Sequence, residues 1–297
     1  MSRCGKALLT ALVICSIFIL NLGLFAQTTA QCGTQGLVIP APAGPGAQLT
    51  DLDDKGNILG LYSSGTGFSG FLLSQGTLAH FRFPGSADTF PRDINKNSVI
   101  VGSYDLVANG PQHAFMVRNG AFSEIKLPGF PNAPVTANGI NDLGDITGQL
   151  LANGVQQGYL LHQGTVTLIS FPGATGGTFP TSINNAGVIV GTYKIGGPGS
   201  FNHGFMWKSG VFTTIDVPGA QDTSPAKIND NGVIVGDGLD SLGVARGFAL
   251  SKGQFFNLVP NSGGTEIHAL NNFNNVLGEE DSAKSSFPFK AFCGKVF

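Results

Sequence analysis

The sequence places an Asp or Asn at one fixed position in each of six similar segments, and side chains of this type can bind a hard cation. Six of them on a ring would supply oxygen ligands for Ca²⁺. Each one, however, begins a short turn that ends in Gly or a substitute for it, where an Asp or Asn side chain usually bonds to its own backbone. We therefore interpret them as turn residues and expect no metal site. They are Asp53, Asn95, Asn141, Asn184, Asn229 and Asn271.

A second repeated position carries basic or ionisable side chains, namely His113, His203, Arg246 and Lys290. If these four faced a shared cavity, they would form a partly basic ring able to bind a carboxylate or sulfate group. The alternative is that they are polar residues at strand ends, which are ordinary at the edge of a sheet. The sequence leaves both interpretations open, and we take the four as candidate ligand-binding residues.

Acidic side chains gather in the segments that vary most between repeats, and Asp237 and Glu280 are further candidate ligand-binding residues. A pair of carboxylates about 5 to 10 Å apart could serve a glycosidase. The alternative is that they are solvated charges of surface loops. The sequence contains no Ser-His-Asp order, zinc spacing, phosphate-binding loop or dinucleotide fingerprint. We therefore expect no catalytic residues, metal or cofactor, and a protein that binds rather than one that catalyses.

These residues belong to a phrase of nine residues that occurs six times and ends in Gly each time. Its spacing gives a repeat of about 44 residues, and self-similarity at a period of 20 to 50 residues indicates an array of packed structural units. The copies lie at 52–60, 94–102, 140–148, 183–191, 228–236 and 270–278.

One repeat predicts four short strands. In the fifth copy, residues 226–228 and 233–236 flank an Asn-Asp-Asn-Gly turn and predict a hairpin. Residues 247–250 and 255–259 predict a second pair around a tight turn. A lone four-stranded sheet cannot bury both faces, so neighbouring units must pack on one another. Six such units fit an all-β, six-bladed β-propeller with four-stranded antiparallel blades. A solenoid is the alternative, although its units are usually shorter.

Each third strand opens with a polar residue, a small residue and an aromatic one, as in His113-Ala114-Phe115 and His203-Gly204-Phe205. Together with the Ile-Asn turn and the Val-Pro-Gly-Ala segment at 217–220, this pattern resembles the bacterial extracellular repeat family named HAF after its His-Ala-Phe signature. The resemblance covers essentially the whole chain after residue 30, although only residues 113–115 carry the signature intact. It implies an exported, propeller-like repeat protein with no established activity.

The sixth unit lacks a fourth strand, because the sequence ends at Phe297. Residues 36–42 stand at the spacing of a fourth strand ahead of the first unit. We expect this N-terminal strand to complete the last blade, which would remove two open sheet edges. Cys32 and Cys293 would then lie on either side of one hairpin, and we predict a disulfide between them. Two free thiols are the alternative.

Residues 1–30 have the layout of a secretory signal peptide, with Arg3 and Lys6 ahead of an apolar run at 7–25 and small residues up to Ala30. An uncleaved membrane anchor is the alternative, because the run is nearly long enough to span a bilayer. Residues 31–297 would form a single domain. With 11% charged residues and a formal net charge of −2, the chain has no feature typical of nucleic-acid or lipid binding.

These observations predict a secreted or periplasmic bacterial protein that is monomeric and has no membrane span once the signal peptide is cleaved. Repeat proteins keep their scaffold and vary on the binding face, so the variable loops between second and third strands predict that face. The expected function is a non-catalytic binding or interaction module for an extracellular or cell-surface ligand, either a glycan or a protein. The alternative is a carbohydrate-active hydrolase or lyase on a propeller scaffold.

Overall fold

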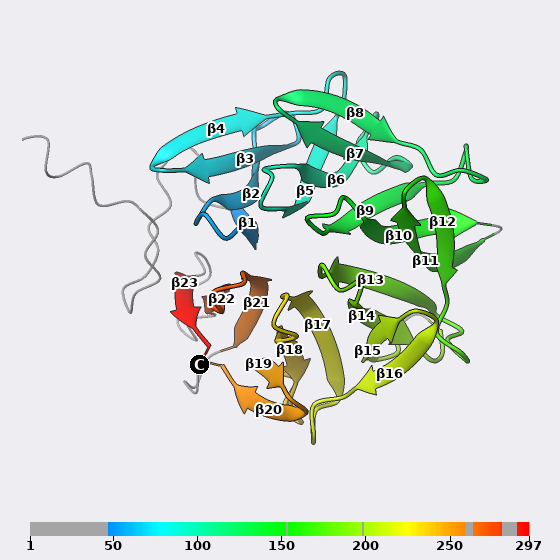
Figure 1. The fold of residues 1–297 in the computed structure, drawn as a ribbon, viewed down its shortest axis with the longest axis vertical. Coiled ribbons are helices and arrows are strands. Elements are labelled where there is room, and N and C mark those ends of the chain that lie inside the picture. Colours follow the sequence, from blue (N-terminus) through cyan, green and yellow to red (C-terminus); the bar gives the residue numbers. More distant parts are fainter. Residues whose placement is uncertain (1–46, 153, 198, 259–263, 281–289, 297) are drawn as a thin grey trace, which may run out of the picture.

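The computed structural model describes residues 47–152, 154–197, 199–258, 264–280 and 290–296. Within these ranges the chain forms 23 β-strands, which make six antiparallel sheets around a central axis (Figure 1). Five sheets hold four strands each, and the sixth holds three described strands. The predicted six-bladed β-propeller is therefore confirmed. No described segment forms a helix with the length and apolar character that crossing a membrane requires.

The strands of each blade run in sequence order from the central channel to the rim (Figure 1). Blade 1 contains β1 (Gln48–Leu52), β2 (Ile58–Ser63), β3 (Phe68–Ser74) and β4 (Thr77–Phe81). Blade 2 contains β5 (Asp88–Ile94), β6 (Ile100–Asp105), β7 (Gln112–Arg118) and β8 (Ala121–Ile125). Blade 3 contains β9 (Val135–Ile140), β10 (Ile146–Ala152), β11 (Val155–His162) and β12 (Thr165–Ile169).

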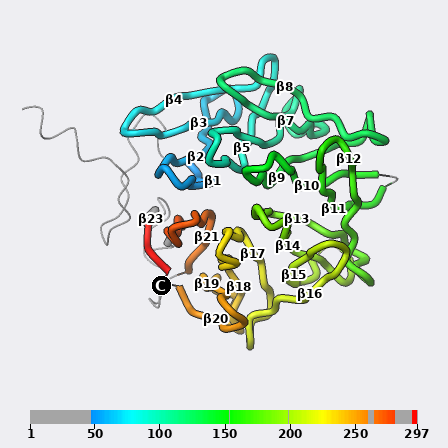
Figure 2. The backbone as a smooth tube through the Cα atoms, viewed as in Figure 1, coloured from blue at the N-terminus to red at the C-terminus, as the bar shows by residue number. Residues whose placement is uncertain are grey.

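Blade 4 contains β13 (Gly177–Ile183), β14 (Ile189–Lys194), β15 (Asn202–Lys208) and β16 (Val211–Ile215). Blade 5 contains β17 (Asp222–Ile228), β18 (Ile234–Leu239), β19 (Ala245–Ser251) and β20 (Gln254–Asn257). Blade 6 contains β21 (Thr265–Leu270), β22 (Asn275–Glu280) and β23 (Lys290–Lys295). The chain winds once around the axis, so that blades 1 and 6 lie side by side (Figure 2).

The glycine that closes each phrase makes room for the aromatic residue of the third strand. Gly60 pairs directly with Phe71 across β2 and β3, and a Cβ atom at Gly60 would overlap the Phe71 ring. The Phe71 side chain is fully buried. The same pairing recurs between Gly148 and Tyr159. The glycine that ends the repeated phrase and the aromatic residue of the third strand therefore pack directly against each other.

The small residue before that aromatic makes room for the next blade. A Cβ at Gly158 would overlap Pro180 of blade 4, and a Cβ at Gly204 would crowd Pro225 of blade 5. A residue without a side chain lets the neighbouring first strand approach closely. The small residue of the triplet is therefore explained by close contact with the next blade.

The hydrophobic core lies between adjacent blades. One cluster joins Leu59 of blade 1 to Ile94, Tyr104 and Phe115 of blade 2, and five further clusters surround the axis. At about 25 cal/mol for each Å² of apolar surface buried, these contacts supply the main stabilisation of a sheet that cannot cover itself. This arrangement is the stacking that the repeat predicted.

Each first strand contains a β-bulge three residues before the repeated Asp or Asn. In β5 the register shifts between Pro91 and Asp93, and the other five first strands shift at the same place. A bulge redirects the side chains beside it. In this fold it turns the residue after it, such as Asp93, into the central channel.

The expected closure of blade 6 involves residues outside the described ranges. Cys293 lies in β23 opposite Leu277 and is buried, whereas Cys32 and residues 36–42 are among residues 1–46. The strand that would complete the blade and the Cys32–Cys293 disulfide therefore stay predictions. The same holds for the signal peptide at 1–30.

Candidate functional site

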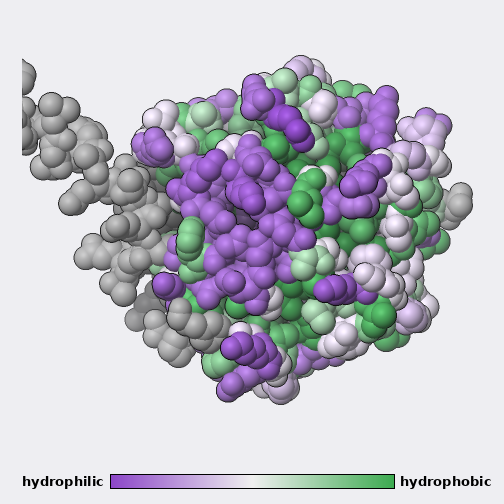
Figure 3. Space-filling model, in the orientation of Figure 1, coloured by the Kyte–Doolittle hydropathy of each residue, from purple (hydrophilic) through white to green (hydrophobic). Residues whose placement is uncertain are grey.

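The propeller has two faces with different chemistry. The turn face carries the hairpin turns between first and second strands, and the loop face carries the variable loops between second and third strands together with the links between blades. Seen from the turn side, hydrophilic side chains gather around the mouth of the channel (Figure 3). We describe this mouth first.

The repeated Asp and Asn residues cap their own turns. Asn95 Oδ1 accepts the backbone N–H groups of Asn97 at 3.1 Å and Val99 at 3.0 Å. Asp53 accepts those of Lys55 and Asn57, both at 2.9 Å. The same pair of bonds occurs in the other four turns. Their interpretation as turn residues agrees with these contacts.

The amide groups of these residues also join the blades, which local sequence reasoning missed. Asn95 Nδ2 donates to the carbonyl of Asn141 at 3.0 Å, and each Asn donates in turn to the next blade until Asn271 reaches the carbonyl of Asp53 at 3.2 Å. Five amides thus form a row of hydrogen bonds around the mouth. A run of Asn at one repeat position is the sequence signal for this row.

A second row runs through the residues that follow, Asp54, Lys96, Asp142, Asn185, Asp230 and Asn272. The backbone N–H of each residue from blade 2 to blade 6 donates to the side chain of the next blade, as Asn272 does to Asp54 Oδ1 at 2.7 Å. We call the two rows together the turn belt. Its carboxylates and amides are engaged with one another.

The turn belt has one gap, between blades 1 and 2. Asp53 carries no amide to donate to Asn95, and Lys96 carries no oxygen to accept the backbone N–H of Asp54. Lys96 instead pairs with Asp142 of blade 3 at 3.0 Å. Each row therefore has five links and two ends.

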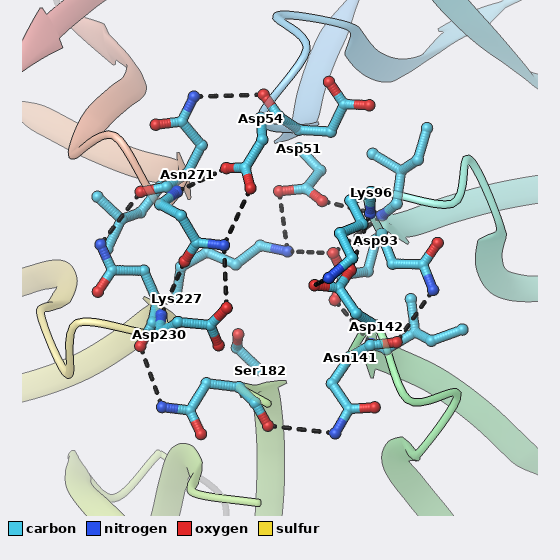
Figure 4. A pocket seen from close by; sticks show the side chains of 18 of the residues that line it. Asp51, Asp54, Asp93, Lys96, Asn141, Asp142, Ser182, Lys227, Asp230 and Asn271 are labelled. Carbon is cyan, nitrogen blue, oxygen red and sulfur yellow. Dashed lines mark hydrogen bonds and ion pairs between the residues drawn. The ribbon is translucent and has the colours of Figure 1, made fainter. Parts of the chain in front are cut away.

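Three charged side chains cross the channel beneath the turn belt (Figure 4). Lys227 Nζ of blade 5 lies 2.9 Å from Asp51 Oδ1 of blade 1 and 2.7 Å from Asp93 Oδ1 of blade 2. The remaining carboxylate oxygens accept the backbone N–H groups of Ile94 at 2.9 Å and Ile140 at 2.8 Å. We call Asp51, Asp93 and Lys227 the channel trio.

Burial and the interactions within the channel trio together shift the pKa values of its three residues. It raises the pKa of Asp51 well above the usual range, and the negative charge of Asp93 adds to this effect. Burial acts on Asp93 too, but the Lys227 charge and the hydrogen bonds from Asp51 and Lys227 lower the pKa of Asp93. The two carboxylates raise the pKa of Lys227 despite its burial. The trio is therefore a compact charge cluster in which Asp51 most readily holds a proton.

A cavity of about 80 Å³ lies between the turn belt and the channel trio (Figure 4). Its polar lining is bonded internally, and the described residues contain no group of His, Cys, Asp and Glu arranged to hold a metal ion. The polar side chains at this mouth therefore join the blades to one another.

The structure gives each candidate histidine a partner within its own blade. His113 Nδ1 lies 3.3 Å from Glu124 and its ring stacks on Tyr104. His203 Nδ1 lies 3.3 Å from Asp216 and its ring stacks on Tyr193. These contacts place the two histidines in separate blades, as polar residues at strand starts.

Arg246, at the same repeat position, bonds to Asp240 Oδ2 at 3.0 Å through its Nε atom. The side chains of Lys290 and Glu280 lie outside the described ranges. The proposed basic ring therefore stays a prediction for Lys290, and Glu280 as a ligand-binding residue is likewise untested.

Asp237 is a candidate residue whose carboxyl group has a raised pKa. Burial raises the pKa of its carboxyl to about 7, and the nearby charge of Glu266 adds to this effect. The backbone N–H of Ile267 bonds to the carboxylate and acts in the opposite direction. Asp237 of blade 5 is thus held against the first strand of blade 6.

Three further titratable residues, Glu266, His268 and Glu279, lie in strands β21 and β22 of the neighbouring blade 6. Glu266 is exposed and pairs directly across strands with Glu279, which is buried. Burial raises the pKa of Glu279, the hydrogen bond from the backbone N–H of Leu49 in blade 1 acts in the opposite direction, and the Glu266 charge adds to the rise. His268 Nε2 lies 3.8 Å from Glu279 Oε1, and burial lowers the pKa of this histidine.

Exposed apolar side chains surround the loop face. Twelve large hydrophobic residues of the described chain are exposed, and eight of them lie in or beside the loops between second and third strands. We call these eight the loop crown; they are Phe68, Leu106, Val107, Leu151, Val155, Ile195, Phe201 and Leu242. They come from blades 1 to 5, and the most exposed is Leu242 at 83%.

Comparison with known proteins supports the fold. No family model and no curated protein matches this sequence. The β-propeller domain of the Trilobed protease from Pyrococcus furiosus superposes with a TM-score of 0.57 at 11% identity, over 83% of this chain and 78% of that one. TolB from Acinetobacter baumannii gives 0.54 at 16% identity, over 71% and 53%.

The acylaminoacyl peptidase of Pyrococcus horikoshii gives a TM-score of 0.54 at 11% identity, over 83% of this chain and 43% of that one. The chain thus spans about half the length of TolB or of this peptidase. These likenesses establish the propeller fold. At such low identities they support only the fold and not the function.

Proposed function

We propose that this protein is an exported, non-catalytic interaction module that binds a protein partner through its loop face. The loop crown is the observation that carries the proposal. Large exposed apolar side chains on one face mark interaction surfaces, and burying one such side chain contributes about 1.5–3 kcal/mol. Six of the eight crown residues are aliphatic, which favours a protein surface over a glycan, because sugars pack on aromatic rings and polar groups.

The placement of the crown supports the same function. The loops that carry it vary between repeats, while the turn face is bonded internally by the turn belt. A constant scaffold with a variable face is the usual design of repeat proteins that bind partners. Export is part of the proposal and is supported by the signal-peptide layout of residues 1–30 and by the HAF-type pattern.

A crown variant tests this proposal. We would compare the native protein with Leu106→Ser combined with Leu242→Ser in cross-linking and co-purification from the producing cells. The matched control is Leu143→Ser combined with Val211→Ser, because these residues are also exposed but lie away from the loop face. A partner retained by the control and lost by the crown variant supports the proposal, whereas equal retention by all three proteins contradicts it.

A second candidate function, a carbohydrate-active hydrolase or lyase, is favoured by one observation. Asp237, with a pKa of about 7, interacts electrostatically with the exposed Glu266, and a pair of carboxyl groups can supply the acid and the base of a hydrolase. Turnover on a polysaccharide panel, lost in Asp237→Asn and kept in Asp240→Asn, would favour this enzyme. A lack of turnover would leave the interaction module as the function.

A further inference from the structure

We propose that the guanidinium group of Arg92 binds a small carboxylate inside the central channel, on the loop side of the channel trio. This site goes beyond the proposed function, because it uses neither the loop crown nor the turn belt. The position of Arg92, its exposure to solvent and its lack of a partner among the described residues carry the proposal.

The innermost strands expose every second side chain on the loop side of the channel trio. In β5, Phe90 is half-buried and Arg92 is exposed, whereas Pro91 and Asp93 are buried. The other first strands alternate in the same way around the axis (Figure 1), so these side chains border a solvent-filled part of the channel, which we call the channel recess. Its lining consists of the unpaired bulge residues Thr50, Arg92, Asn138, Thr181, Ala226 and His268 and of the residues two positions before them, Gln48, Phe90, Thr136, Phe179, Ser224 and Glu266.

The channel trio separates this recess from the turn-side mouth. The cavity at that mouth is lined by Asp51, Asp93 and Lys227 of the trio, but by none of the six bulge residues. Arg92 comes directly before Asp93 in β5, on the side of the trio that faces the loops. Its exposed side chain therefore meets solvent in the channel recess and not in the turn-side cavity.

Arg92 has no partner in the part of the chain that the structure describes. Its guanidinium group carries five N–H donors, yet it forms no hydrogen bond or ion pair with a described residue. The bulge residues of the next two blades do bond to a neighbour: Asn138 Nδ2 donates to the carbonyl of Pro180 at 2.9 Å, and Thr181 Oγ1 donates to that of Pro225 at 2.8 Å. This position joins blades in blades 3 and 4, a role that Arg92 does not perform.

The surroundings of Arg92 favour an anion. Burial lowers the pKa of Arg92 although its side chain is exposed, which is the combination expected in a narrow recess. No carboxylate contributes to the shift of this pKa, because Glu266 acts on groups of blades 5 and 6. The guanidinium group stays charged at neutral pH, and an ion that is poorly solvated gains most from a charged partner.

The lining of the channel recess matches a single negative charge. Its other ionisable groups are Glu266 and His268, and burial lowers the pKa of the histidine. A dianion such as phosphate would leave one charge unmatched, whereas one guanidinium fork pairs with one carboxylate in a bidentate geometry. Phe90 and Phe179 are half-buried and offer apolar contact. A monocarboxylate with an apolar body is therefore the ligand that fits.

The experiment titrates the whole protein with 4-fluorobenzoate and follows binding by fluorine NMR at neutral pH. We expect this acid to bind at least tenfold more tightly than the neutral 4-fluorobenzyl alcohol. Arg92→Gln should weaken binding of the acid at least tenfold, and Arg92→Lys at least threefold, because lysine keeps the charge but lacks the fork. Arg118→Gln is the matched control, since Arg118 is exposed in β7 away from the channel, and it should bind the acid as the native protein does.

Absence of binding by the native protein, equal binding of the acid and the alcohol, or unchanged binding in the Arg92 variants overturns the inference. If Arg92→Gln does not fold, Arg92→Lys decides the result. Tighter binding of 4-fluorophenyl phosphate than of the acid overturns the choice of a carboxylate. Leu106→Ser combined with Leu242→Ser should leave binding of the acid unchanged, so the failure of this site and the failure of the proposed function are separate results.

Two sources of a carboxylate are distinguished by a tripeptide that ends in 4-fluorophenylalanine, with a free carboxylate or as the amide. A free tripeptide that binds more tightly than 4-fluorobenzoate, with its amide weaker at least tenfold, supports the site and identifies the end of a peptide chain as the ligand. Tighter binding of 4-fluorobenzoate supports the site and identifies a small free acid. Equal binding of the tripeptide and its amide at the Arg92 site overturns recognition of the carboxylate.

Discussion

Lys227 Nζ lies 2.7 Å from Asp93 Oδ1 although the two residues are 134 positions apart in the chain. The bond crosses the channel from blade 5 to blade 2, and a second bond reaches Asp51 of blade 1 at 2.9 Å. All three side chains are less than a tenth exposed. The channel trio therefore ties together blades that share no strand pairing.

Replacing Lys227 tests this tie. Lys227→Met leaves two buried carboxylates facing each other, and removing one partner of a buried ion pair typically costs about 3–5 kcal/mol. We expect a loss of this size in chemical denaturation. Adding Asp51→Asn and Asp93→Asn to the same protein should restore much of the stability, because the uncompensated charges are gone. Equal stability of the native protein and Lys227→Met would contradict the role of the trio.

The raised pKa of Asp237 predicts a pH dependence. A carboxyl with a pKa of 3.8 in the unfolded chain and about 7 in the fold holds its proton more tightly when folded. The free energy of unfolding should therefore fall as the pH rises from about 4 to about 7, by up to about 4 kcal/mol from this group. Asp237→Asn removes the titration and keeps an acceptor for Ile267. The stability of the variant relative to the native protein should rise across that window, and a constant difference would count against the shift.

The fit of Gly60 to Phe71 predicts a local packing cost. Gly60→Ala places a methyl group against the buried ring and against the backbone of β1, and overpacking of this kind costs about 1–3 kcal/mol. Gly197→Ala is the control, because its Cβ would meet no atom within 4 Å. Thermal unfolding of both variants measures the difference. If Gly60→Ala is as stable as the control, room for the aromatic ring is not the reason that each repeated phrase ends in Gly.

The gap in the turn belt predicts a stabilising pair of substitutions. Asp53→Asn together with Asn57→Asp copies blade 3, where Asn141 Nδ2 donates to Asp145 Oδ2 at 3.0 Å and also to Asn184 of blade 4. The new amide should donate to the Asn95 carbonyl and stabilise the fold by about 0.5–1.5 kcal/mol. Asn57→Asp alone should destabilise it, since two carboxylates would then face each other. A double variant no more stable than the native protein would refute this account of the gap.

The blades could be predicted from the sequence because the residues that define them contact residues of the same unit or of the next one. The Asn turns and the Gly and aromatic positions repeat, and each predicts contacts within one unit or between neighbours. The channel trio could not be predicted in this way, because its repeat position holds different residues in different blades: Asp51, Asp93, Gly139, Ser182, Lys227 and Ala269. Two acids and one base at a position otherwise small were the available signal.

The pairing of Glu266 with Glu279 escaped sequence reasoning for a related reason. Glu266 lies in a first strand and not in a variable loop, and only pairing between β21 and β22 brings it opposite Glu279. His268 shared its repeat position with no other histidine. Sequence reasoning found Asp237 because it follows a phrase, but the pKa of its carboxyl depends on burial beneath the next blade.

The two ends of the turn belt also mark the blade boundary at which the ring should open most easily. At five blade boundaries a backbone N–H at the channel mouth donates to the side chain of the next blade, while Lys96, the corresponding residue after Asp54, has no oxygen to accept the Asp54 N–H. Thermal opening should therefore begin between blades 1 and 2, and hydrogen exchange should be fast at Asp54 and slow at Lys96, Asp142, Asn185, Asp230 and Asn272. Slow exchange at all six positions would show a ring without a weakest boundary.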